Sequence, residues 1–131
     1  QDIILVSGNP AIKELIAIHC GITGLDGFKS MPNLERLDLS ENGIANLLGI
    51  EQYQNLKRLA LRNTKINDLM LLTKLSSLEE LDLRGMDTEL DLSPLLHISK
   101  LQKLICSPNM QAHIDRIKNE AEFAIEVLEL Q

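Results

Sequence analysis

Four arginines with three acidic residues among them could form a binding site. Arg36 and Arg58 lie 22 positions apart, and so do Arg62 and Arg84. A guanidinium group donates several hydrogen bonds in one plane, so it can hold a carboxylate with two parallel bonds. We expect this set to contact the charged groups of a protein partner; its members are Arg36, Asp38, Arg58, Arg62, Glu80, Asp82 and Arg84.

A second interpretation of the same charges is a solvated network in which the arginines pair with their own acidic neighbours. Exposed ion pairs of that kind stabilise a protein by only ~0–1 kcal/mol each. No aromatic residue accompanies the set, although Tyr and Trp commonly anchor tight interfaces. The sequence leaves both interpretations open.

No constellation of residues in the sequence indicates catalysis, a metal site or a cofactor. His19 and Cys20 are adjacent, but neighbouring residues of a strand face opposite ways, so their side chains should not meet. His97 and His113 lack the nearby cysteine or the repeated carboxylate spacing of a zinc site. We therefore expect no enzymatic activity, no metal and no cofactor.

The elements that position these side chains follow from a 22-residue period. Residues 34–44 form the pattern LxxLxLxxNxI, and the same slots recur 22 residues before and after it. Such a period indicates a repeat architecture. The alternation within LxxLxL predicts a short strand whose leucines point inward and whose charged residues point outward. Five such strands, stacked in parallel, should begin at Ile12, Leu34, Leu56, Leu78 and Leu101.

The second half of each repeat carries an apolar residue at every third position, as in Ile44, Leu47, Ile50 and Tyr53. This spacing places side chains on one side only in a coil with three residues per turn or in a short helix. We expect these segments to form the wall opposite the strands.

Between the two halves lies a slot for an amide side chain that can satisfy turning backbone groups. Asn42 and Asn109 keep the amide, and Cys20 is tolerated there. Thr64 and Met86 depart from it, so we expect the ladder of amides to be interrupted.

These patterns closely resemble the leucine-rich repeat family, whose consensus is LxxLxLxx(N/C)xL. The length and the LxxLxxL second half are similar to those of bacterial internalins and of the regulatory subunit of protein phosphatase 1. The resemblance covers residues 12–131. It implies an α/β fold, a right-handed solenoid with a parallel sheet on its concave face and 3-10 or short helical segments on its convex face. It also implies that the concave face, with the charged set above, binds a protein.

The ends of the array should differ from its middle. Residues 1–11 are expected to form an N-terminal cap or partial repeat, in which Ile3 to Val6 could be a capping strand. Residues 12–131 form the repeat domain, with repeats starting at 12, 34, 56, 78 and 101. The fourth repeat has 23 residues, and its insertion in GMDTELD should bulge outward.

Beyond Leu101 the sequence predicts a helix followed by a last strand. Ile114, Ile117 and Ala121 share one helical face. A strand over 125–130 should then align Ile125 with Leu101, 24 residues earlier. A last strand with an open edge could support self-association.

Composition excludes several classes of function. The net charge of −6 argues against nucleic-acid binding, which rests on basic surface. No apolar run approaches the ~18 residues that a membrane span needs, so no membrane insertion is expected. Cys20 and Cys106 should be inward, reduced and four repeats apart, which favours a cytoplasmic protein. A fragment of an internalin-like protein would instead be at the cell surface or secreted.

We therefore hypothesise a non-catalytic protein–protein interaction module that binds its partner through the concave strand face. The alternative is a structural or regulatory repeat segment of a larger enzyme or signalling protein.

Overall fold

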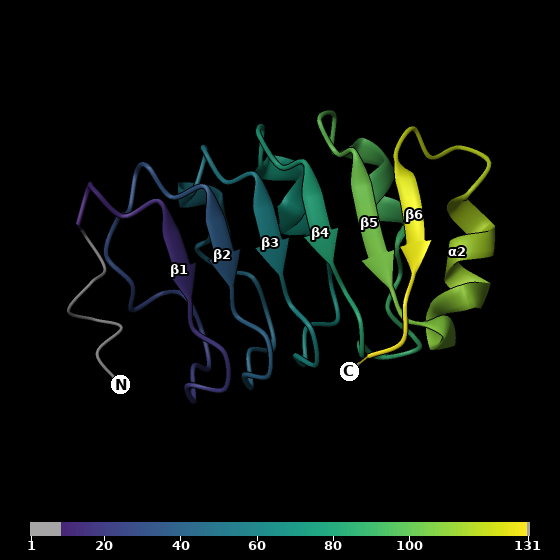
Figure 1. The fold of residues 1–131 in the computed structure, drawn as a ribbon, viewed down its shortest axis with the longest axis horizontal. Helices are drawn as coiled ribbons and strands as arrows, with labels where there is room; N and C mark the ends of the chain where they lie inside the picture. The colour runs from purple at the N-terminus through teal and green to yellow at the C-terminus, as the bar shows by residue number, and fades with distance from the viewer. Residues whose placement is uncertain (1–8, 131) are drawn as a thin grey trace.

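The computed structural model describes residues 9–130, which contain one six-stranded sheet. All strands are parallel and lie side by side in sequence order (Figure 1). An α/β architecture with a parallel sheet is thereby confirmed. The expected capping strand from Ile3 to Val6 lies outside the described residues. The strands are β1 (Glu14–Ile16), β2 (Arg36–Asp38), β3 (Arg58–Ala60), β4 (Glu80–Asp82), β5 (Lys103–Cys106) and β6 (Ala124–Val127).

Each of the first five strands begins two residues after the predicted start. The first leucine of a repeat is buried but ends the preceding turn, as when the Leu34 amide donates to the Met31 carbonyl at 3.1 Å. The following alternation is as predicted, because Leu37 is 1% exposed whereas Arg36 is exposed.

The register follows the repeat. Leu15, Leu37, Leu59 and Leu81 are successive partners, each 22 residues from the next. Between β4 and β5 the offset becomes 23, since Glu80 pairs with Lys103. The inserted residue is thus accommodated between strands, as expected.

Short helical segments form the opposite wall of the core. The residues spaced by three are almost fully buried, with Ile44, Leu47, Ile50 and Tyr53 at most 1% exposed. Their side chains pack with the inward leucines into one continuous cluster. The segments are the 3-10 helices η1 (Ile50–Gln52), η2 (Met70–Lys74), η3 (Ser93–His97) and η4 (Pro108–Met110), and the α-helix α2 (Gln111–Ile117).

The predicted register of the last strand was wrong. Ile125 pairs with Leu104, an offset of 21 rather than the expected 24, and β6 ends at Val127. The predicted helix is present but shorter: α2 ends at Ile117, and the Ala121 amide closes the following turn on the Ile117 carbonyl at 3.0 Å. The chain therefore returns to the sheet early, and Leu128 is 40% exposed.

The interrupted amide ladder is confirmed. Asn42 is buried and bonds backbone groups of two repeats, whereas the Thr64 hydroxyl donates to the Leu61 carbonyl within its own repeat. Cys106 is buried, as expected, but Cys20 is only half-buried, and both thiols are free.

Candidate functional site

The outward side chains of β1–β5, with those of the residues just after each strand, form a surface that we call the strand face. Register places Arg36, Arg58 and Glu80 in one row across β2, β3 and β4. A parallel row runs through Asp38, Ala60 and Asp82. Strand spacing of ~4.8 Å makes the members of each row direct neighbours.

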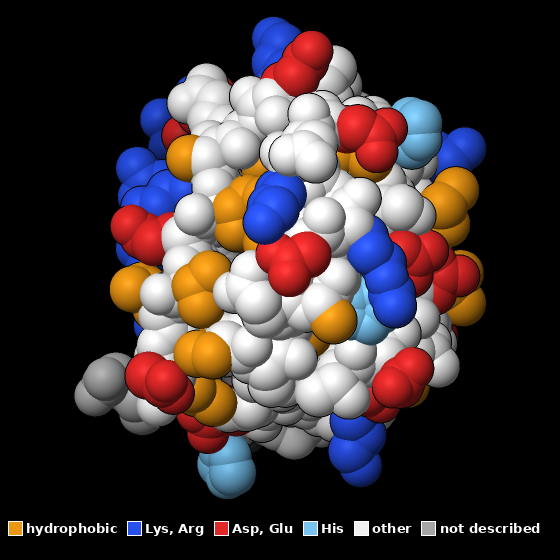
Figure 2. Space-filling view, turned by 90° about the vertical axis from the view of Figure 1, so that its right-hand side faces the viewer, with side chains coloured by type: hydrophobic (Ala, Val, Ile, Leu, Met, Phe, Trp, Pro, Cys, Tyr) orange, Lys and Arg blue, Asp and Glu red, His pale blue; other side chains and the backbone are white. Residues whose placement is uncertain are grey.

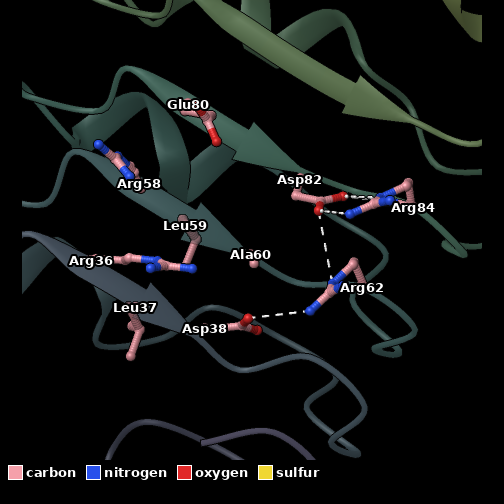
Figure 3. Close-up of a pocket in the computed structure, with 10 residues that line it drawn as sticks. All are labelled: Arg36, Leu37, Asp38, Arg58, Leu59, Ala60, Arg62, Glu80, Asp82 and Arg84. Atoms are coloured by element: carbon pink, nitrogen blue, oxygen red, sulfur yellow. Dashed lines mark hydrogen bonds and ion pairs between the residues drawn. The ribbon is translucent and has the colours of Figure 1, made fainter. Parts of the chain in front are cut away.

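A hollow of about 170 Å³ lies over these rows (Figure 3). Every residue of the predicted charged set lines it, together with Leu37, Leu59 and Ala60. We call it the arginine hollow. The structure therefore brings all seven residues together, and their role in binding stays a prediction.

Arg62 and Arg84 hold the two aspartates at one side of the hollow. Arg84 makes a two-pronged contact, with Nε 3.0 Å from Asp82 Oδ1 and Nη2 2.7 Å from Asp82 Oδ2. Arg62 bridges β2 and β4, because its Nη2 lies 3.3 Å from Asp38 Oδ2 and its Nε 3.8 Å from Asp82 Oδ2. Figure 3 marks these contacts as a chain from Asp38 to Arg84.

The aspartates are buried rather than solvated, which sequence reasoning missed. Asp38 is 5% exposed and Asp82 9%. Each also accepts a hydrogen bond from the backbone amide two residues on, Ser40 at 3.0 Å and Arg84 at 3.2 Å. An Asp side chain that accepts a hydrogen bond from the amide two residues on forms an Asx turn. An Asp at the end of a strand is therefore the sequence signal of this arrangement. The hydrogen bonds that Arg84 donates to the Asp82 carboxylate raise the pKa of the Arg84 guanidinium. This half of the hollow is therefore a paired network.

Arg36 and Arg58 occupy the other side of the hollow (Figure 3). Arg36 Nη1 donates to Glu14 Oε2 on β1 at 2.8 Å. The side chains of Arg58 and Glu80 make no hydrogen bond or ion pair with any residue between 9 and 130, although the Arg58 backbone amide donates to the Glu35 carbonyl at 3.0 Å. Self-pairing is therefore observed for Arg36, Arg62 and Arg84, and only the Arg58 guanidinium lacks a partner within residues 9–130.

Ala60 forms the floor of the hollow. It stands between Asp38 and Asp82 in the register, and its side chain ends at Cβ. Since both aspartates are drawn toward Arg62 and Arg84, the space above Ala60 stays open. A larger residue here would fill the hollow.

Residues that follow the strands adopt a left-handed conformation that the sequence did not predict. His19, Glu41, Asn63 and Gly85 have φ of 56°, 60°, 56° and 75°. They occupy equivalent repeat positions 22 apart, where the chain turns away from the sheet. Gly85 meets no Cβ penalty in this conformation, and Asn63 and His19 are of types enriched there among non-glycine residues, whereas Glu41 is not.

Among residues 9–130, the titratable side chains outside the hollow include an exposed histidine beside a glutamate. His19 Nδ1 lies 4.0 Å from Glu41 Oε1, and its side chain is 85% exposed. In the described part of the chain, no group of three or more His, Cys, Asp and Glu residues could hold a metal ion. Over the same residues, no helix has the length and apolar character needed to cross a bilayer.

The end of the molecule at β6 and α2 exposes apolar side chains among charged ones (Figure 2). Val127 and Leu128 are 39% and 40% exposed. Glu126 pairs with Lys103 of β5 at 3.4 Å. Among the described strands, β6 pairs with β5 alone, so its other edge is open.

Comparison of the sequence with protein-family models and with curated proteins found no match.

Proposed function

We propose that this protein is a non-catalytic protein–protein interaction module of the leucine-rich repeat type. In this proposal the sheet is the concave face of a right-handed solenoid, and the strand face holds the partner. The 22-residue register and the buried every-third-residue wall support the repeat assignment.

One observation carries the functional part of the proposal. Seven charged side chains from three neighbouring strands converge on one hollow, and one arginine among them has no partner within residues 9–130. Arginine is common among the residues that dominate binding energy at interfaces. The hollow, of about 170 Å³, has room for one side chain of a partner protein.

The test compares Arg58→Glu with Lys74→Glu as baits in native extract. Both changes alter the net charge by −2, but Lys74 lies in η2 on the opposite wall. Proteins captured by the wild type and by Lys74→Glu should fall at least tenfold with Arg58→Glu by quantitative mass spectrometry. Direct binding of the purified partner should show the same order. Equal capture by both variants would leave the alternative, a structural segment of a larger protein.

Self-association through β6 is a second proposal, favoured by its open edge. The amides of Ala124 and Leu128 donate to β5, so alternation points the Val127 amide away from the sheet. Val127→Pro removes that donor without breaking a bond to β5. A dimer by light scattering that becomes a monomer in this variant would support the proposal, whereas a monomeric wild type would refute it.

A further inference from the structure

The strand face carries two arginines side by side whose charges the protein only partly compensates. Arg36 and Arg58 are direct register partners on β2 and β3. Like charges in such positions destabilise a sheet. Arg36 has Glu14 as its partner, but Arg58 has none among residues 9–130. The guanidinium donors of Arg58 are therefore available to a ligand.

The charge around the arginine hollow suits a ligand with one negative charge. Over the hollow and the two depressions that share Arg58 with it, seven basic side chains stand against six acidic ones. This leaves a local charge of +1 on a chain whose net charge is −6. A phosphate would bring nearly two charges toward Asp38, Glu80 and Asp82. A carboxylate brings one, and its two oxygens match the planar donors of arginine.

The shape around Arg58 suits an extended segment. Arg58 borders the arginine hollow and two further depressions at the beginning of the strands. One of these extends to Lys13 on the β1 side and the other to Lys103 on the β5 side. The three depressions share Arg58, so they lie next to one another across the strands with Arg58 between them.

We propose that the strand face recognises an acidic peptide segment, one Glu or Asp side chain of which enters the arginine hollow and binds Arg58 beside Arg36. This inference rests on the proposed function, because it names the chemistry of the partner. The incoming carboxylate offsets the repulsion between the two guanidinium groups. Asp38 and Asp82 are bound by Arg62 and Arg84. Glu80 is the register partner of Arg58 on β4 but makes no ion pair with it, so no carboxylate of residues 9–130 is bound to Arg58.

The test uses a blocked hexaglutamate peptide as the probe and hexaglutamine as its neutral control. Binding is followed by calorimetry and by the NMR signals of the arginine Nε–Hε groups, among which the Arg58 signal is identified by its loss in Arg58→Gln. Hexaglutamate should bind and shift the Arg58 signal, whereas hexaglutamine should not. Because the chain is acidic overall, non-specific attraction of hexaglutamate is not expected.

Matched variants separate the site from general charge. Arg58→Gln should weaken hexaglutamate binding at least tenfold, whereas Lys74→Gln, with the same loss of one charge, should leave it within twofold. Ala60→Leu keeps Arg58 but fills the hollow, and it should also abolish binding. Circular dichroism checks that each variant is folded.

Absence of hexaglutamate binding, or equal binding by Arg58→Gln, would overturn the proposal. So would inorganic phosphate that shifts the Arg58 signal when hexaglutamate does not. None of these results would refute the strand face as a protein-binding surface, because that proposal is tested by protein capture with Arg58→Glu. The proposal of an acidic peptide ligand and the proposal of a protein-binding strand face can thus be refuted separately.

Discussion

Asn42 joins two neighbouring repeats through one buried amide. Its Oδ1 accepts hydrogen bonds from the backbone amides of Cys20 and Ile22 at 2.9 and 3.0 Å. Its Nδ2 donates to the Ala17 carbonyl at 2.8 Å and to the Leu39 carbonyl at 2.9 Å. These groups turn away from the ladders of the sheet, so the side chain supplies partners that the backbone there does not.

Asn42→Ala should lower the free energy of unfolding by about 2–5 kcal/mol, because several buried backbone groups lose their partner at ~1–3 kcal/mol each. Asn109→Ala is the matched control, since Asn109 fills the same slot but is exposed. Its Nδ2 donates to the Met86 carbonyl and its Oδ1 accepts from the Ser107 hydroxyl. We expect a loss of about 1 kcal/mol or less for the control. Urea denaturation followed by circular dichroism measures both, and equal losses would contradict the role assigned to Asn42.

Two buried groups, the Tyr53 hydroxyl and the Cys106 thiol, make the free energy of unfolding depend on pH in the alkaline range. Burial raises the pKa of Tyr53 to about 12 and that of the Cys106 thiol to about 12. The Tyr53 hydroxyl has no hydrogen-bond partner within the described residues. In the unfolded chain these groups ionise near pH 10 and ~8.5, so between those values and pH 12 the unfolded state binds fewer protons.

The contribution of Tyr53 and Cys106 to the free energy of unfolding should therefore be complete below about pH 8 and should fall as the pH rises toward 12. Cys106→Val removes the thiol at similar volume, so the decline between pH 9 and 11 should become shallower. Tyr53→Phe should act in the same direction above pH 10, and at neutral pH it should not destabilise, because an unpaired hydroxyl is removed. Urea unfolding at a series of pH values measures these slopes, and identical slopes in wild type and Cys106→Val would be the contrary result.

At the scale of elements, the strands and the opposite wall could be predicted because each depends on a short period. The side chains of β2 and β3 alternate with period two, and the residues around η1 recur every three. α2 packs against η3 and η4, and the point at which it ends cannot be predicted from a local period of apolar residues. The three-residue error in the register of β6 follows from that.

The candidate site was likewise predictable in part. Its seven residues came together because register carries outward positions across the sheet. Which arginine is paired could not be read from the sequence, since the bridge from Arg62 to Asp38 and Asp82 depends on side-chain reach across two strands. Arg58 is the arginine of this set whose side chain is left without a partner within residues 9–130.

Substitution of Gly85 tests the left-handed turn that follows β4. It has φ of +75°, and a Cβ there would overlap Asn63 Oδ1 and come within 2.9 Å of Leu130 Cδ2. Gly85→Ala should therefore cost about 1–3 kcal/mol of unfolding free energy. Gly43→Ala is the control, because nothing lies within 4 Å of its Cβ position and its φ is not in the positive range. It should be neutral or stabilise by about 0.4–1 kcal/mol. Thermal denaturation distinguishes the two, and a neutral Gly85→Ala would contradict the close approach.

At the scale of the whole molecule, a single apolar cluster runs from β1 to α2. It includes Leu15 at one end, Leu59 near the middle and Ile117 at the other end. In such an array each repeat gains most of its stability from its neighbours. An inner repeat has a neighbour on both sides, whereas the repeat of β1 has one described strand beside it.

Position in the array should therefore decide the effect of the same substitution. Leu59 pairs with Leu37 and Leu81 and is 1% exposed, whereas Leu15 pairs with Leu37 alone among the described strands and is 8% exposed. Leu59→Ala should cost about 3–5 kcal/mol, toward the upper end for buried leucines, and Leu15→Ala about 2 kcal/mol. Urea unfolding of both variants should remain a single transition, because the core is continuous. A second transition in Leu59→Ala would mean that the repeats on either side of β3 unfold independently, and it would refute a cooperative unit extending from β1 to β6.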